Sequence, residues 1–316
     1  MIKKKNLLRA AFVALTGASA SACSTCGCSF NSDWETQGLA SGSGFRYDLR
    51  YDTFTQNQAR NGTEVANPWP AAGHEQELFT RNRVLTVGID YSPTADWGLN
   101  LQIPFIERIH ATNGVTGPGT DDGTSSARGL GDIRLTARYQ GFTAAHDFGL
   151  QAGLKLPTGG FHQTFDGGTI AGDPLDRGLQ LGTGTTDLLA GAFRFGQLGT
   201  QWDYFAQVMA QVPLDSREDY RPGKSLNVNL GFRYLGMGNV IPQLQFNGKV
   251  TGHDSGGAAS PDDSGGRTLY VSQGITFPLV AGMRGYVFWQ VPVYQDLNGY
   301  QLAPKSILTL GARYEY

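Results

Sequence analysis

From about residue 43 onward, hydrophobic and polar positions alternate along the chain with a period of two. In the stretch 132–139, one face carries Ile133, Leu135, Ala137 and Tyr139, and the other carries Asp132, Arg134, Thr136 and Arg138. Because successive side chains of a β-strand point to opposite sides, this alternation predicts a strand with one apolar and one polar face. The same split recurs at 148–157 and at 202–212. An all-β fold is therefore expected.

Segments of this type, together with the turn signals between them, predict twelve strands. Their ranges are 43–56, 77–92, 97–110, 128–142, 146–158, 178–195, 200–212, 223–236, 239–252, 266–278, 282–294 and 303–316. The even number is the one expected of a bacterial outer-membrane barrel.

The connections between these segments alternate between short and long. Short links, such as SPTAD at 92–96 and GQLG at 196–199, alternate with long ones rich in Gly, Asp, Asn, Ser and Pro. The long ones lie near 57–76, 111–127, 159–177, 213–222, 253–265 and 295–302. Short periplasmic turns and long extracellular loops are typical of a transmembrane, antiparallel, up-and-down β-barrel. Each segment is long enough, since about 9–11 tilted residues cross the bilayer.

A soluble β-sandwich or secreted barrel would show the same alternation, so the pattern alone leaves both architectures open. The C-terminus favours the membrane barrel. Its last strand carries one apolar face, formed by Leu308, Leu310, Ala312, Tyr314 and Tyr316. An aromatic ending of this kind resembles the signal read by the barrel-assembly machinery, which is therefore an expected partner. In hydrocarbon the sheet must close, because unsatisfied strand edges are costly there.

In a membrane barrel the polar strand faces line the lumen. Alternation places these charged residues inside as candidate lumen or solute-contacting groups: Arg46, Arg50, Asp132, Arg134, Arg138, Asp187, Arg233, Arg284 and Arg313. The two acids are expected to pair with lumen arginines such as Arg134, Arg194 and Arg233. Aromatic residues at strand ends are expected to form the two interfacial girdles. They are Tyr91, Trp97, Phe142, Trp202, Tyr234, Phe277, Tyr314 and Tyr316.

The first 22 residues have the pattern of a signal peptide. Three lysines at 3–5 and Arg9 precede the apolar run AAFVAL, and Ala20-Ser21-Ala22 matches the A-x-A cleavage rule. The predicted domains are then a signal peptide at 1–22, a periplasmic segment at 23–42 and a cell outer membrane barrel at 43–316. Without these four basic residues, 21 of the 25 Lys and Arg remain against 27 Asp and Glu, a net charge of −6. Outer-membrane lipid is an expected partner and nucleic acid is not.

The segment at 23–42 contains all three cysteines of the chain, Cys23, Cys26 and Cys28. The CxxCxC spacing lets the three thiols approach one soft metal ion, for which Cu(I) and zinc are the candidates. A disulfide between Cys23 and Cys26 or Cys28 is an alternative, and so is a lipid on Cys23, although position 20 is alanine and not the usual leucine of a lipobox. No histidine follows as in CxxCH, so haem attachment has no support. No cofactor is required by the rest of the sequence.

An enzymatic barrel is not predicted. The five histidines, at 74, 110, 146, 162 and 253, are scattered and lie mostly in predicted loops, and neither GxSxG nor HExxH occurs. Pro157-Thr158-Gly159-Gly160 ends a strand and is expected to be a turn that stops pairing. The loop at 161–176 that follows carries Phe161, His162 and Phe165, which could form an apolar gate if the loop folds inward.

Three stretches then carry a resemblance: GLGDIRLTARY from Gly129, LKLPTGG from Leu154 and LGTGTTDLLAGAFRF from Leu181. Together they resemble the outer-membrane family named for the meta-pathway of phenol degradation. The resemblance implies an outer-membrane channel or transporter in a Gram-negative cell, linked to uptake of small apolar or aromatic solutes. The alternatives are a non-conducting structural or adhesive barrel, and a copper- or zinc-linked outer-membrane component.

Overall fold

The computed structural model describes residues 43–66, 76–114, 120–280 and 282–316. Its strands are β1 Gly44–Gly62, β2 Glu64–Val65, β3 Glu77–Ser92, β4 Trp97–Thr112, β5 Gly123–Leu130, β6 Ile133–Tyr139, β7 Phe148–Leu156, β8 Gly167–Gly168, β9 Asp187–Leu198, β10 Trp202–Pro213, β11 Ser225–Tyr234, β12 Ile241–Thr251, β13 Gly266–Pro278 and β14 Met283–Glu315. A short 3-10 helix, η2, covers Arg177–Leu179. Within the described ranges, no helix is long and apolar enough to cross a membrane.

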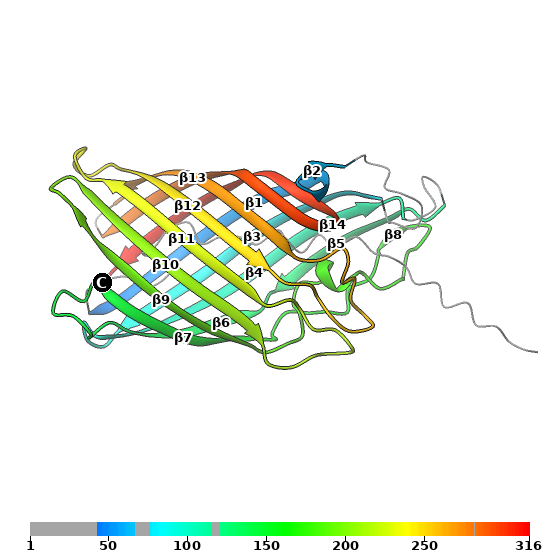
Figure 1. Ribbon diagram of the computed structural model, residues 1–316, viewed down its shortest axis with the longest axis horizontal. Coiled ribbons are helices and arrows are strands. Elements are labelled where there is room, and N and C mark those ends of the chain that lie inside the picture. The colour runs from blue at the N-terminus through cyan, green and yellow to red at the C-terminus, as the bar shows by residue number, and fades with distance from the viewer. Residues whose placement is uncertain (1–42, 67–75, 115–119, 281) are drawn as a thin grey trace, which may run out of the picture.

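Antiparallel pairing closes the sheet into a barrel (Figure 1). Among the described residues, eleven labelled strands form the ring. Their order around the barrel is β1, β14, β13, β12, β11, β10, β9, β7, β6, β4 and β3, and β3 pairs again with β1. The label β14 covers two spans, because residues 283–297 pair with β13 and residues 300–315 pair with β1. Twelve spans result. The predicted antiparallel barrel, with short turns at one end and long loops at the other, is confirmed.

The strand predicted at 128–142 is interrupted. On β4, two residues lie between Gln102 and Phe105, whereas three lie between their partners Arg134 and Leu130, so the opposite strand carries one extra residue. This bulge ends β5 and starts β6. Glycine fits closely here, because a Cβ on Gly131 would lie 2.6 Å from Cδ1 of Ile106 and would displace that side chain.

The strand predicted from 178 begins only at Asp187. Before it, residues 177–179 form η2 and residues 180–186 form a loop in which Gly184 takes a positive φ of 75°. The polar side chains of Thr183 and Thr185 make hydrogen bonds inside the barrel mouth instead of extending the strand. Sequence alternation could not reveal this, because Thr183 bonds Asp132 between β5 and β6 and Lys155 on β7, which lie far from it along the chain.

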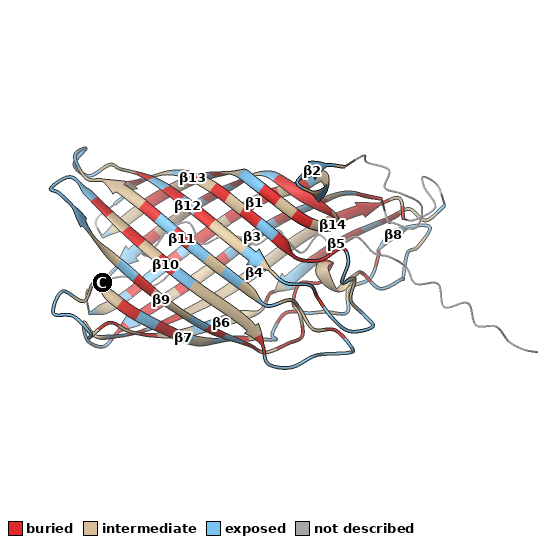
Figure 2. Cartoon of the chain, in the orientation of Figure 1, coloured by how far each residue is buried: buried red, intermediate tan, exposed pale blue. Residues whose placement is uncertain are grey.

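Buried and exposed positions alternate along the wall strands, so that neighbouring residues differ in burial (Figure 2). On β1 the buried set includes Arg46, Asp48, Arg50 and Asp52, and the intervening Tyr47 and Leu49 are exposed. The polar face therefore lines the lumen, and the apolar face points outward, where a bilayer covers it.

The predicted aromatic residues lie at strand ends, but they belong to one end only. Tyr91 and Trp97 flank one short turn, and Trp202 and Tyr234 pack together at 4.9 Å beside another. The remaining four, Phe142, Phe277, Tyr314 and Tyr316, also lie beside short turns or the C-terminus. The prediction that this set forms two girdles was wrong, because alternate strand ends return to the same edge of the barrel.

The predicted signal peptide at 1–22 and the segment at 23–42, with Cys23, Cys26 and Cys28, lie outside the described residues. The proposals for cleavage, metal, disulfide and lipid at this segment therefore stay predictions.

Candidate functional site

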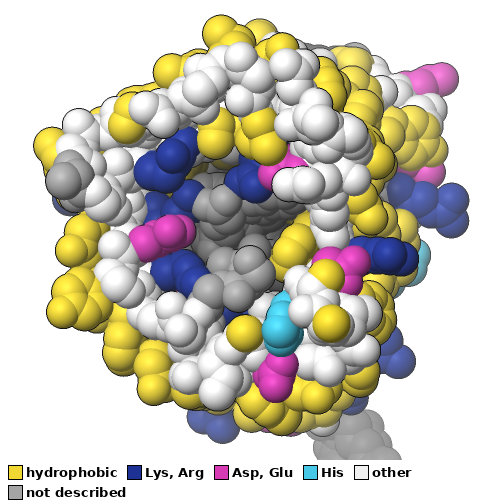
Figure 3. All heavy atoms as spheres, turned by 90° about the vertical axis from the view of Figure 1, so that its left-hand side faces the viewer, with side chains coloured by type: hydrophobic (Ala, Val, Ile, Leu, Met, Phe, Trp, Pro, Cys, Tyr) yellow, Lys and Arg dark blue, Asp and Glu magenta, His cyan; other side chains and the backbone are white. Residues whose placement is uncertain are grey.

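Charged residues on β1, β3, β6 and β14 form the part of the lumen that we call the ion-pair wall. It consists of Arg46, Asp48, Arg50, Asp52, Asp90, Arg138 and Arg313, all of them buried. Seen from the short-turn end, basic and acidic side chains gather inside the ring, and hydrophobic side chains surround it (Figure 3).

Asp90 is the centre of this wall. One of its carboxylate oxygens accepts from Nη1 of Arg46 at 2.9 Å, and the other accepts from Nη1 of Arg138 at 2.6 Å. Next along the wall, Asp52 accepts from Nε of Arg50 at 2.8 Å. Charge-assisted hydrogen bonds of this length satisfy groups that would be costly to bury alone. The wall is thus held by pairs within β1, between β1 and β3, and between β3 and β6 across β4.

The opposite part of the lumen is held by neutral side chains, which we call the amide ladder. Gln151, Gln207, Asn229, Asn247 and Ser272 lie on β7, β10, β11, β12 and β13, one on each strand. Each bonds to the next around the barrel, with donor–acceptor distances of 2.9, 3.1, 3.0 and 2.5 Å. This ladder holds five strands in register without any charge.

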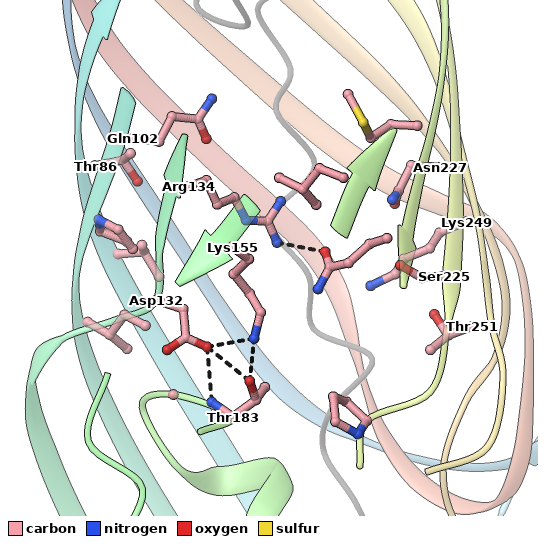
Figure 4. Close-up of a pocket in the computed structure, with 18 of the residues that line it drawn as sticks. Thr86, Gln102, Asp132, Arg134, Lys155, Thr183, Ser225, Asn227, Lys249 and Thr251 are labelled. Atoms are coloured by element: carbon pink, nitrogen blue, oxygen red, sulfur yellow. Dashed lines mark hydrogen bonds and ion pairs between the residues drawn. The ribbon is translucent and has the colours of Figure 1, made fainter. Parts of the chain in front are cut away.

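Between these two walls and the long loops lies a cavity of about 390 Å³. Six basic side chains and two acidic ones contribute to its lining: Arg50, Arg108, Arg134, Lys155, Arg177, Lys249, Asp132 and Asp254. Figure 4 shows Arg134, Lys155 and Lys249 arranged around this space with Thr86, Gln102 and Asn227. Arg134 is exposed to the cavity, and its guanidinium donates to the neutral amide oxygen of Gln211 at 3.2 Å.

The three stretches that carry the family resemblance meet at Asp132 below this cavity. Its carboxylate accepts from Nζ of Lys155 at 2.9 Å, from the backbone N–H of Gly159 at 3.0 Å and from the backbone N–H of Thr183 at 3.0 Å (Figure 4). Gly159 and Gly182 approach so closely that a Cβ on Gly182 would lie 2.5 Å from the carbonyl oxygen of Gly159. The glycines and the threonines of these motifs therefore serve one buried junction.

The arginine partners expected for the two acids were wrong. Both Asp132 and Asp187 pair with Lys155, at 2.9 and 3.3 Å. Arg194 points outward and lies 3.7 Å from Asp147, because β9 begins at Asp187 and its even positions face away from the lumen. The remaining candidate, Arg233, pairs with Asp203 at 2.5 Å. Lys155 stands on the predicted polar face, but nothing in the sequence singles it out.

The loop after β7 is tied into the barrel mouth. Nη1 of Arg108, on β4, donates to the carbonyl oxygens of Gly178 and Gln180 at 3.1 and 2.8 Å. This brings residues 177, 178 and 180–183 to the cavity lining. Phe161, His162 and Phe165 are not part of that lining: Phe165 packs inside the loop with Leu175 and Leu179, and His162 bonds Glu218 at 3.0 Å.

Among the predicted lumen residues, only Arg50, Asp132 and Arg134 line the cavity. Arg46, Arg138 and Arg313 belong to the ion-pair wall, and Asp187 is buried against Lys155. Arg284 lies at the short-turn end and donates to the carbonyl oxygen of Asn239 at 3.1 Å. Whether any of them contacts a solute stays a prediction. In the described part of the chain, no group of three His, Cys, Asp or Glu residues could hold a metal ion.

Comparison with known proteins supports the fold. No family model matches the chain, and no curated protein matches it. Among solved structures, it is similar to the COG4313 outer membrane channel from Pseudomonas putida F1, with a TM-score of 0.63 and 16% identity over 88% of this chain and 97% of that one. The β domain of the Bordetella autotransporter BrkA is also similar, with a TM-score of 0.48 and 14% identity over 87% and 100%. The Pseudomonas putida toluene transporter TodX gives a TM-score of 0.45 and 10% identity over 95% and 97%. The chain thus has the fold of outer-membrane channels.

Proposed function

We propose that this protein is a channel of the cell outer membrane for small aromatic or otherwise apolar solutes, and that it favours those carrying an acidic group. The resemblance of the three sequence stretches supports the aromatic class and the meta-pathway family. The observation that carries the preference for an acidic group is Arg134, an exposed guanidinium in the cavity whose partner Gln211 is neutral. A carboxylate is the natural bidentate partner for such a group.

The size and lining of the cavity fit this class of solute. A volume of about 390 Å³ lies in the range of small-molecule sites. Apolar side chains, including Phe54, Ile106 and Met209, lie in the same lining as the basic ones. The aromatic ring of such a solute would contact these apolar side chains while the carboxylate of the solute bonds Arg134. Transport, and not catalysis, is the activity that this arrangement supports.

The test is ion conductance of the refolded chain without residues 1–22 in a planar bilayer, with selectivity obtained from the reversal potential. We expect anion preference and a block by benzoate that neutral benzyl alcohol does not produce. Arg134→Gln should lower the anion-to-cation permeability ratio about twofold, as expected for one lining charge. Arg194→Gln is the matched control, because that arginine points away from the lumen.

Absence of conductance in a folded, heat-modifiable barrel would contradict the channel and favour a structural or adhesive barrel. Conductance with equal block by the neutral and the acidic solute would leave the channel standing and remove the preference for an acid. The copper- or zinc-linked alternative is tested separately, by metal analysis of the chain with Cys23, Cys26 and Cys28 present or replaced by serine.

A further inference from the structure

The outer wall of the barrel carries a basic cluster that the channel function does not use. Arg83, Glu107 and Arg128 lie directly opposite one another across β3, β4 and β5, nearer to the long-loop ends of these strands than to the short turns. They point outward, because the adjacent residues Asn82 and Ala127 are buried on the inner face. These charges therefore face the membrane and not the solute path.

Two guanidinium groups share one carboxylate in this cluster. Nη1 of Arg83 lies 3.1 Å from Glu107, and Nη2 of Arg128 lies 2.5 Å from its other oxygen. The side chains of Arg83 and Arg128 are 43% and 71% exposed, so most of their donors remain available. Arg81, also exposed, lies two residues further along β3 towards the loops. The cluster has three positive charges and one negative charge.

A hollow of about 520 Å³ lies against this cluster on the outer wall. Its lining joins the charged residues to apolar ones, among them Tyr51, Leu85 and Phe105. Those three stand in the next row of the sheet towards the short turns, since Leu85 pairs with both Tyr51 and Phe105. The surface thus changes from apolar to basic within one step along the strands.

The change falls near the outer boundary of the membrane. Tyr91 belongs to the aromatic residues at the short-turn end, and Arg83 lies eight residues from it on β3. This spacing is about 26 Å along the strand. At a strand tilt of about 40°, it corresponds to about 20 Å along the membrane normal. The apolar band of such barrels is about 25 Å tall, and long arginine side chains reach beyond their own level. The guanidinium groups of Arg83 and Arg128 can therefore extend to the level of the phosphate groups of outer-leaflet lipids.

We infer that this surface binds a phosphorylated lipid of the outer leaflet, of the lipid A class, with its phosphate on Arg83 and Arg128 and an acyl chain along Leu85 and Phe105. Guanidinium groups bind phosphate in a bidentate manner, and one carboxylate cannot neutralise three of them. The apolar hollow next to the basic residues would accommodate an acyl chain. A free phosphate ion has no such chain, so the hollow favours a phosphorylated lipid.

Native mass spectrometry of the folded chain in detergent tests this, with lipid A and its dephosphorylated form as probes. We expect lipid A to bind and the double variant Arg83→Gln/Arg128→Gln to bind it at least about fivefold more weakly. Arg194→Gln is the control. It removes an arginine that also points outward and also pairs with a carboxylate, that of Asp147, but lies at the short-turn end of the barrel. This variant should bind lipid A as the native chain does. Heat modifiability checks that each variant is folded.

Three results would overturn the inference: equal binding by the double variant, equal binding of dephosphorylated lipid, or full displacement of lipid A by inorganic phosphate at millimolar concentration. Leu85→Ser provides a second variant, which should weaken lipid A binding without removing any charge. None of these results bears on conductance, so the site and the proposed channel can fail independently.

Discussion

The ion-pair wall and the amide ladder solve the same problem with different chemistry. Both must satisfy polar groups that are buried inside the barrel. On the ion-pair wall, Asp90 accepts from Arg46 and Arg138 at once, so a single residue holds two charges. In the amide ladder, a residue such as Asn229 both accepts and donates a hydrogen bond, so that the hydrogen bonds are distributed over five strands.

This difference predicts where the lumen is sensitive and where it tolerates change. Removing one partner of a buried ion pair leaves an uncompensated charge, whereas removing one amide leaves single hydrogen bonds unmade. The cavity between the two walls differs again, because Arg134 is exposed and its partner is neutral. Its charge is therefore available for a solute.

The largest expected effect is that of Asp90→Asn. It leaves Arg46 and Arg138 without their shared carboxylate, and we expect the free energy of unfolding to fall by about 3–5 kcal/mol. Urea titration of the protein in liposomes, with tryptophan fluorescence as the signal of unfolding, measures this loss of free energy. Asp96→Asn is the control, because Asp96 is half-exposed in a turn. A loss no larger than that of the control would show that the wall does not depend on this carboxylate.

A smaller effect is expected for Asn229→Ala in the amide ladder. It removes the partner of Gln207 and of Asn247 at once, which should cost about 1–2 kcal/mol in the same urea titration. Asn227→Ala is the matched control: Asn227 lines the cavity two residues earlier and its side chain has no hydrogen-bond partner among the described residues. Equal losses for the two variants would argue against a continuous ladder.

For Arg134→Gln we expect almost no change in stability, within about 0.5 kcal/mol, because the group is exposed and has no charged partner in the described part of the chain. The change should appear in the reversal potential instead. A variant that unfolds as easily as Asp90→Asn would mean that Arg134 is a structural residue and would remove it from the solute path.

The smallest effect concerns pH. Burial raises the pKa of Asp254 in the loop after β12, and hydrogen bonds from Gly223 and Tyr220 oppose this shift. A raised pKa means that the folded state takes up the proton before the unfolded state does. As pH falls through the window between the raised and the usual value, this group's contribution to stability therefore increases. Asp254→Asn should remove that increase, which is measured by urea titration at pH 7 and at acidic pH. An unchanged pH dependence would contradict it.

Much of the barrel could be predicted from local alternation. The range 77–92 for β3 matches the structure, and the inward faces of Arg46, Arg50 and Arg138 follow from counting every second residue. The counting fails only where a strand does not begin or continue as expected. The bulge at Gly131 and the late start of β9 at Asp187 are such places, and both are set by contacts with other strands.

The sequence by itself determined the architecture: a strand period of two decides which face is polar, and alternating short and long links decide that the strands run up and down. The tertiary structure alone decided the chemistry of the lumen. The sequence does not say that Asp132, Lys155 and Thr183 meet, since they lie up to 51 residues apart. Nor does it say which arginines are neutralised, because charge pairing depends on the register between strands that only the closed barrel fixes.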